Sequence, residues 1–183
     1  MKKVICILGI IGSFFVSSCK KDTVSVVGLD TSYLPLSVGN YWKIDGVDTR
    51  TINETKVFDQ KTYYAITSSY DTSYVRKEND KIIEYHKGKT SVRFDLAANV
   101  NDTWQYRDYT VKLTSKTETI VIGGESVKDC YRFYFDIPAM ADEEHAIWLA
   151  PGIGFIQQEC MGNCIGGKKK LKELKLDGIV YKF

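Results

Sequence analysis

The amino-acid sequence predicts an all-β protein built as an antiparallel meander. Short runs rich in Val, Ile, Thr, Tyr and Phe recur along the chain, and Asn, Asp and Gly separate them. These runs show almost no sustained 3.6-residue period, and nothing between them resembles a helix that would connect parallel strands. We therefore expect a strongly curved sheet, a half-barrel or a sandwich, with little helix outside the first 18 residues.

Those first residues have the pattern of an export signal. Lys2 and Lys3 precede a largely apolar run over residues 4–16, and two serines then lead to Cys19. The run has 13 residues, fewer than the roughly 20 that a membrane-spanning helix needs. Small residues before a cysteine are typical of a bacterial lipobox, in which the thiol receives a diacylglyceryl group before cleavage. The sequence predicts a signal peptide at 1–18 and a lipidated Cys19; an ordinary secretory signal is the alternative.

The rest of the chain fits a tether and one domain. Residues 19–32 are polar and favour no regular element, which predicts a lipidated tether. Residues 33–183 have the size of a single β domain. Two or three acyl chains would hold such a domain stably at a membrane, because each buried methylene contributes about 0.8 kcal/mol.

The charge of the mature chain narrows the classes of partner. Removal of residues 1–18 takes two of the 25 basic residues and no acidic ones, which leaves 23 basic and 23 acidic residues. A net charge of zero argues against nucleic acid, whose binding needs a basic surface that neutralises phosphates. It also argues against a polybasic membrane-binding surface.

The first half of the domain is expected to be a run of strands. Pro35 keeps the opening segment extended, and Gly39-Asn40 supplies a turn before the first strand. The expected strands of this half are 41–45, 49–58, 61–69, 73–77, 81–85 and 91–95.

In the second half a hairpin is the clearest local prediction. Residues 109–122, as one strand or two, turn at Gly123-Gly124 into a strand at 127–136. Three aromatic residues of that strand alternate onto one face of the pleat: Tyr131, Phe133 and Phe135.

The end of the chain is expected to complete the sheet. Residues 139–144 form either one helical turn or a loop. The closing strands are expected at 145–150, 154–159, 169–176 and 179–183. Residues 171–176 fit a helix or a strand, and the Asp177-Gly178 turn that follows at once favours the strand.

Three cysteines remain beside Cys19 in an exported, oxidising compartment. Because three is odd, Cys130, Cys160 and Cys164 can form at most one intramolecular disulfide. Cys160 and Cys164 bracket a tight polar loop, which favours a bridge between them. Pairing of Cys130 with one of them, or three free thiols, are the alternatives.

No catalytic motif stands out. The sequence lacks Gly-x-Ser-x-Gly, His-Glu-x-x-His and Cys-x-x-Cys, so it predicts no catalytic residue, no cofactor and no enzyme. The run from Asp142 to His145 could hold a hard cation through its carboxylates, although a solvated loop is the better interpretation and we predict no metal site. A hydrolase would require carboxylates such as Asp136, Asp142 or Glu144 to converge in one cleft.

Several segments resemble uncharacterised lipoproteins of Bacteroidota-type bacteria. They are the lipobox running into residues 19–22 (CKKD), residues 34–42 (LPLSVGNYW), residues 94–96 (FDL), residues 100–104 (VNDTW) and residues 148–155 (WLAPGIGF). Asn101-Asp102 stands where Gly-Asp is expected. The resemblance implies a secreted, lipid-anchored β domain with a curved sheet like those of lipoprotein-carrier folds, and it implies no reaction.

These observations lead to three functional hypotheses. The first is an envelope lipoprotein that acts as a non-catalytic binding or structural module, with an envelope protein or glycan as partner. The second is a carrier of a lipid or other apolar ligand on the curved sheet, and the third is the carboxylate-based hydrolase. The expected location is the periplasmic face of the outer membrane, with surface exposure as the alternative.

Overall fold

The computed structural model of the chain describes residues 32–138, 140–141, 143–161 and 167–183. Within these residues it contains strands, turns and bends but no helix, which confirms the predicted all-β class. None of the described residues forms a helix of membrane-spanning length and apolarity. The predicted signal peptide, Cys19 and nearly all of the predicted tether lie outside the described residues.

In the described part of the chain, thirteen strands make up one antiparallel sheet. Their bounds are β1 (Tyr41–Ile44), β2 (Thr49–Phe58), β3 (Lys61–Thr67), β4 (Thr72–Glu78), β5 (Lys81–His86), β6 (Lys89–Asp95), β7 (Thr103–Tyr106), β8 (Tyr109–Ile122), β9 (Glu125–Asp136), β10 (His145–Ala150), β11 (Gly154–Cys160), β12 (Lys168–Leu176) and β13 (Ile179–Lys182).

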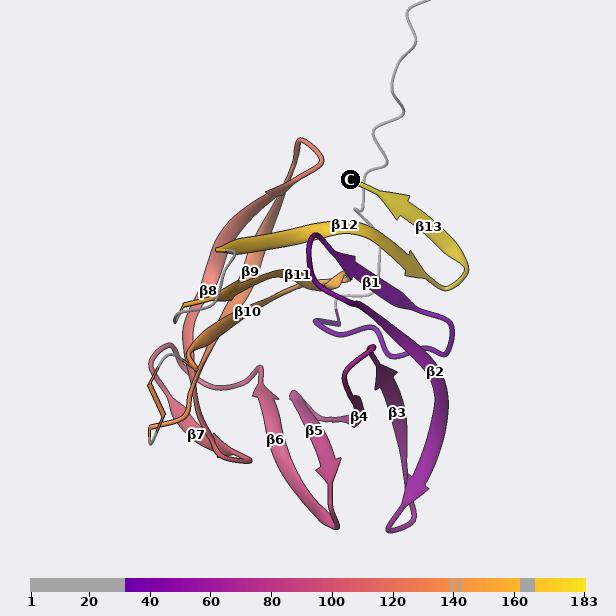
Figure 1. Cartoon of the computed structure of the whole chain (residues 1–183), viewed down its shortest axis with the longest axis vertical. Helices are drawn as coiled ribbons and strands as arrows, with labels where there is room; N and C mark the ends of the chain where they lie inside the picture. The colour runs from indigo at the N-terminus through magenta and orange to yellow at the C-terminus, as the bar shows by residue number, and fades with distance from the viewer. Residues whose placement is uncertain (1–31, 139, 142, 162–166) are drawn as a thin grey trace, which may run out of the picture.

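The sheet consists of two meanders, β1–β6 and β7–β12. They join where β1, the first strand of one, pairs with β12, the last strand of the other. The strand order is β6-β5-β4-β3-β2-β1-β12-β11-β10-β9-β8-β7, and β13 pairs only with β12. This sheet curves until it nearly closes, so that β6 and β7, at opposite ends of the order, lie next to each other (Figure 1). We call this junction the seam. The expected antiparallel, strongly curved sheet is confirmed, and its curvature makes a nearly closed barrel.

Most predicted elements are present with small changes at their ends. β8 is one long strand, and the hairpin to β9 turns at Gly123 and Gly124, both of which have positive φ. The ambiguous residues 171–176 belong to strand β12. The described residues between Pro138 and β10 form no helical turn. Strand β7 was not predicted from the sequence, because four residues are too few for a clear alternating pattern.

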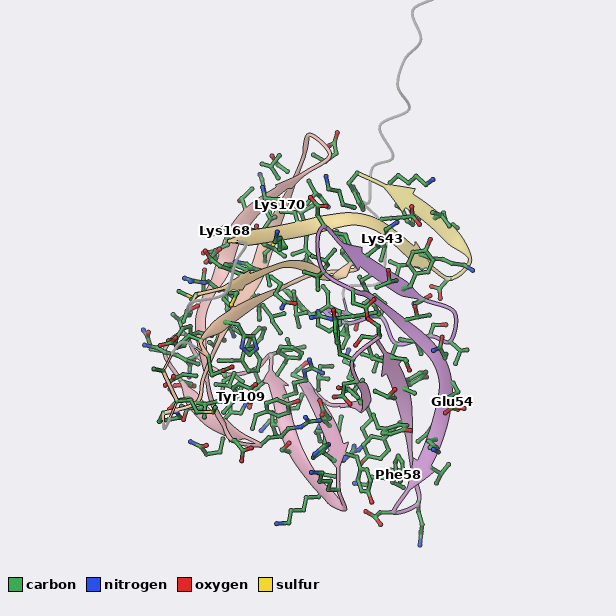
Figure 2. The ribbon with its side chains drawn as sticks, viewed as in Figure 1. Lys43, Glu54, Phe58, Tyr109, Lys168 and Lys170 are labelled. Atoms are coloured by element: carbon green, nitrogen blue, oxygen red, sulfur yellow. The ribbon has the colours of Figure 1, made fainter. Side chains whose placement is uncertain are left out.

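Aromatic side chains fill the centre of the barrel. The Phe94 ring on β6 lies 4.9 Å from Phe133, 5.9 Å from Phe135 and 6.3 Å from Phe155, measured between ring centroids. These rings come from facing walls, and Figure 2 shows side chains filling the space that the strands enclose. The alternation of β9 explains the arrangement, since it turns Phe133 and Phe135 inward together.

The tip of the β8–β9 hairpin packs against the outer face of the sheet. The Trp148 indole, on the face opposite Ile147, donates a hydrogen bond of 2.5 Å to Glu118. Lys170 Nζ donates to the Val121 carbonyl at 2.9 Å. Several side chains are buried in this outer layer and belong to the same apolar cluster as the lumen, among them Ile120, Ile122 and Cys130.

Gly154 is expected to tolerate no side chain. Its φ is +86°, and an added Cβ would lie 2.9 Å from Nε1 of the buried Trp42, which donates a 2.5 Å hydrogen bond to the Ile153 carbonyl. We expect Gly154→Ala to lower the free energy of unfolding by about 2–4 kcal/mol, through backbone strain and overpacking together. Urea unfolding measures the loss. Gly88→Ala is the matched control, because Gly88 has φ +79° and nothing within 4 Å of its added Cβ; an equal loss in both variants would contradict the packing argument.

Candidate functional site

A buried carboxylate, that of Glu84, lies at the seam between β6 and β7. Glu84 on β5 is 0% exposed, because it pairs with Val75 on the face that also carries Ile82. The Tyr106 hydroxyl donates a 2.6 Å hydrogen bond to Oε2 of Glu84. Burial raises the pKa of Tyr106, so its hydroxyl keeps the proton that it donates.

Two arginines complete the environment of Glu84. Arg93 Nη1 donates to Oε2 of Glu84 at 3.1 Å, and Arg107 Nη2 donates to Oε1. Arg93 is the extra residue of a β-bulge in β6, and Arg107 lies in the β7–β8 turn with φ +53°. Burial alone would lower the pKa of Arg93, but the Tyr106 and Glu84 oxygens raise it above its ordinary value. The network therefore connects β5, β6 and β7.

A third arginine lies farther inside without a carboxylate. Arg50 on β2 pairs with Trp42, donates a 2.5 Å hydrogen bond to Oε1 of Gln158, and places its guanidinium 4.4 Å from the centroid of the Phe155 ring. Among the described residues, no carboxylate lies within ion-pair distance of Arg50. Burial and the neighbouring Arg93 charge lower the pKa of Arg50 to about 9. Arg50 is therefore a partly buried cation whose hydrogen-bond partner is neutral.

All three guanidinium groups carry a buried N–H without a partner in the described part of the protein. These atoms are Nη1 of Arg50, Nε of Arg93 and Nε of Arg107. We call the three residues the arginine cluster. A guanidinium has five donors in a fixed plane, and the atoms around the cluster satisfy only some of them.

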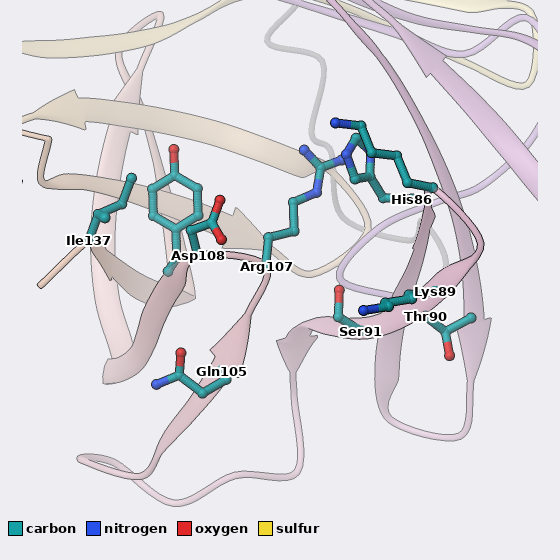
Figure 3. A pocket seen from close by; sticks show the side chains of 10 residues that line it. His86, Lys89, Thr90, Ser91, Gln105, Arg107, Asp108 and Ile137 are labelled. Carbon is teal, nitrogen blue, oxygen red and sulfur yellow. The ribbon is translucent and has the colours of Figure 1, made fainter. Parts of the chain in front are cut away.

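A pocket opens beside the arginine cluster. Its volume is about 780 Å³, and residues of β5, β6, β7, the adjoining turns and the start of β8 line it (Figure 3). We call it the basic pocket; its lining residues are His86, Lys87, Lys89, Thr90, Ser91, Gln105, Arg107, Asp108, Tyr109 and Ile137. Figure 3 shows Arg107 pointing from its turn toward the strand that carries His86. Arg107 thus belongs to both the pocket and the arginine cluster.

His145 lies near the cluster as a neutral ring. It stacks on Phe135 with 4.8 Å between centroids and meets the edge of Tyr109 at 5.4 Å. Burial lowers the pKa of His145 to about 4, against a smaller opposing effect of the Glu143 carbonyl, and the Arg93 and Arg50 charges lower it further. The imidazole is therefore uncharged at neutral pH.

The acidic residues singled out in the sequence lie elsewhere. Asp142 is outside the described residues, and neither Asp136 nor Glu144 lines the basic pocket. Asp136 and Glu144 both lie near Tyr134, whose pKa is raised by burial and by their charges. Within the described ranges, no group of three His, Cys, Asp or Glu side chains is placed to hold a metal ion.

The cysteines have different environments. Cys160 is disulfide-bonded, whereas Cys164 lies outside the described residues, so the Cys160–Cys164 pairing remains a prediction. Cys130 is a free thiol that is fully buried under the β8–β9 hairpin, where its Sγ donates to the Val127 carbonyl at 3.4 Å. Burial raises the pKa of Cys130 to about 12. The alternative pairing through Cys130 does not form.

The residues that make this site were not predicted from the sequence. Arg50, Glu84, Arg93 and Arg107 belong to no motif, and only one of them left a signal. In β5, Glu84 alternates with Ile82, a pattern that places a carboxylate on the apolar face of a strand.

Comparisons with known proteins identify little. No family model matches the chain, and no curated protein matches it. A crystal structure of a protein from Parabacteroides distasonis, provisionally described as a lipoprotein, has a TM-score of 0.42 and 13% identity to this chain. The match covers 80% of this chain and 99% of the other. That description belongs to the other protein, and the lipoprotein motifs of this chain remain sequence predictions.

The neutral His145 makes stability depend on pH in a definite direction. Its pKa of about 4 lies below the ordinary 6.5, so the unfolded chain binds the proton first as the pH falls. We expect about 3 kcal/mol of stability to be lost between pH 6.5 and pH 4. Urea unfolding across this range measures the slope. His145→Phe keeps the stacked ring and removes the titration, so its slope should be smaller; equal slopes would contradict the assignment.

Proposed function

We propose that this chain is a lipid-anchored binding protein of the bacterial cell envelope and that it performs no catalysis. The export signal at 1–18 and Cys19 support the anchor, and the tether would place the β domain close to the membrane. We assign it to the periplasmic face of the outer membrane. Its partners are the membrane, through the acyl chains, and a polar envelope ligand.

The basic pocket is the observation that carries the binding role. Its volume of about 780 Å³ lies within the range of about 300–1,000 Å³ that is usual for small-molecule sites. Hydroxyl and amide groups of Thr90, Ser91 and Gln105 line it beside lysines and Arg107. Such a lining suits a ligand with hydroxyl groups and negative charge.

The carrier hypothesis has less support. An apolar ligand would need space on the concave face, and there the Phe94, Phe133 and Phe155 rings of facing walls already contact one another. The lumen is therefore packed with protein in its described part. A hydrolase would need a second carboxylate beside Glu84, and the groups that surround Glu84 are arginines and a tyrosine.

Mass spectrometry of the protein from its own envelope tests both parts of this proposal. Extracted in mild detergent and then denatured, the chain is expected to have the mass of residues 19–183 plus a diacylglyceryl group and any additional acyl chain. Under native conditions we expect a further mass, which is lost on denaturation and belongs to a polar molecule.

Cys19→Ser is the matched control for the anchor, since it should lack the lipid mass and leave the membrane fraction. A wild-type mass without lipid would contradict the anchor. A native mass equal to the denatured mass in every preparation would contradict the binding role.

A further inference from the structure

The arginine cluster, at the seam and on β2, carries more positive than negative charge. Arg93 and Arg107 share the carboxylate of Glu84, and Arg50 pairs with no acid among the described residues. Three cations against one anion leave an excess of two positive charges. Asp48 and Asp71 attract Arg50 and Arg93 only at longer range and form no ion pair with them.

An excess of buried charge is unfavourable in a closed protein. A buried ion loses its hydration, and this loss is offset only by a counter-charge with good hydrogen bonds. Each member of the cluster also has one buried N–H that no described atom accepts, which adds a desolvation penalty. Arg93 and Arg107 share one carboxylate, and the Arg93 charge opposes that of Arg50. The arrangement suits a site whose counter-charge comes from outside the chain.

We propose that the arginine cluster binds the oxyanion of a small polar ligand that enters through the basic pocket. This inference rests on the proposed binding function and names the class of its ligand. Arg107 belongs to the pocket wall and makes the first contact. Arg93, which shares Glu84 with Arg107, and Arg50, which is affected by the Arg93 charge, supply further charge and unpartnered donors.

The chemistry of the cluster selects phosphate, sulfate or carboxylate oxygens. Guanidinium groups bind such oxygens in pairs through their planar fork of N–H donors. Lys87 and Lys89 add positive charge at the pocket, where Asp108 is the one acid in the lining. A sugar phosphate or a phospholipid headgroup both carry this oxyanion, and the hydroxyl and amide side chains of the pocket favour the sugar.

Thermal unfolding of the full chain, purified in neutral detergent, tests the proposal. Inorganic phosphate should raise the unfolding temperature more than sodium chloride of equal ionic strength does, because it binds the folded state. Arg50→Met should weaken phosphate binding by about 10- to 100-fold, the range expected for losing hydrogen bonds to a charged group. In chloride alone the same variant should be at least as stable as the wild type, since it removes a partly buried charge that pairs with no described carboxylate.

Two further variants separate this effect from a general loss of folding. Arg132→Met is the matched control: Arg132 also has a buried Nε without a described partner, but it lies on the outer face over Trp148. Its phosphate affinity should equal that of the wild type. Arg50→Lys keeps the charge without the fork and should bind phosphate with intermediate affinity. Wild-type phosphate affinity in Arg50→Met, or a phosphate effect equal to that of chloride, would overturn the proposal.

The ligand's source is distinguished by two additional probes. A larger shift with glucose 6-phosphate than with phosphate, and none with glucose, supports the oxyanion site and assigns it to a soluble sugar phosphate. A shift with phosphatidylglycerol micelles but not with glucose 6-phosphate supports the site and assigns it to a lipid headgroup. A neutral molecule in the native mass spectrum without any phosphate effect would keep the binding function and overturn only the anion assignment.

Discussion

The buried carboxylate of Glu84 is the constraint on which the seam of this barrel depends. Backbone hydrogen bonds hold together the twelve strands from β6 round to β7, but β6 and β7 themselves form no ladder. Glu84 crosses that junction by binding Arg93 from β6 and the Tyr106–Arg107 pair that ends β7. The Trp104 indole adds one more link, a 2.9 Å hydrogen bond to the Val92 carbonyl. Side chains therefore complete the closure that the backbone leaves open.

The same requirement explains why the functional site lies at the seam. A carboxylate without hydration needs cations and donors around it, and here it is surrounded by two arginines and a tyrosine. Arg50 then adds a positive charge that no described carboxylate pairs with. Arg107, another member of the cluster, lines the basic pocket. Closure of the barrel and recruitment of an anion thus use one set of residues.

The fold could be predicted from the sequence because its signals are local. The alternation of side chains along β9 predicted that Phe133 and Phe135 share one face. The Gly123-Gly124 pair predicted the turn of the long hairpin. Features that depend on pairing between strands, such as β7 and the bulge in β6, could not be predicted in this way. The four-residue β7 is defined by its pairing with β8, and the bulge that exposes Arg93 to Glu84 leaves no mark in a hydrophobic pattern.

The site could not be predicted because its parts lie far apart in the sequence. Arg50 meets Gln158 across 108 positions, and Arg107 meets Glu84 across 23, so neither contact follows from spacing. Charged residues in strands usually face solvent, which made the arginines indistinguishable from surface ones. Of the carboxylates that the sequence did single out, Asp142 lies outside the described residues, and Asp136 and Glu144 do not line the basic pocket. Arg50, Arg93 and Arg107 come from β2, β6 and the turn after β7, so only the folded sheet brings them into one barrel interior.

Hydrogen exchange of wild type and Glu84→Gln tests most directly whether Glu84 holds the seam. Glutamine keeps the shape of the side chain but leaves the partly buried Arg93 and Arg107 without their counter-charge. We expect amides of β6 and β7 and the Trp104 indole N–H to exchange at least about tenfold faster, because leaving one partner of a buried pair unbalanced costs about 3–5 kcal/mol. Amides of β9, β10 and β11 should keep their protection. Equal loss of protection in all strands, or unchanged exchange at β6 and β7, would contradict this account of how the barrel closes.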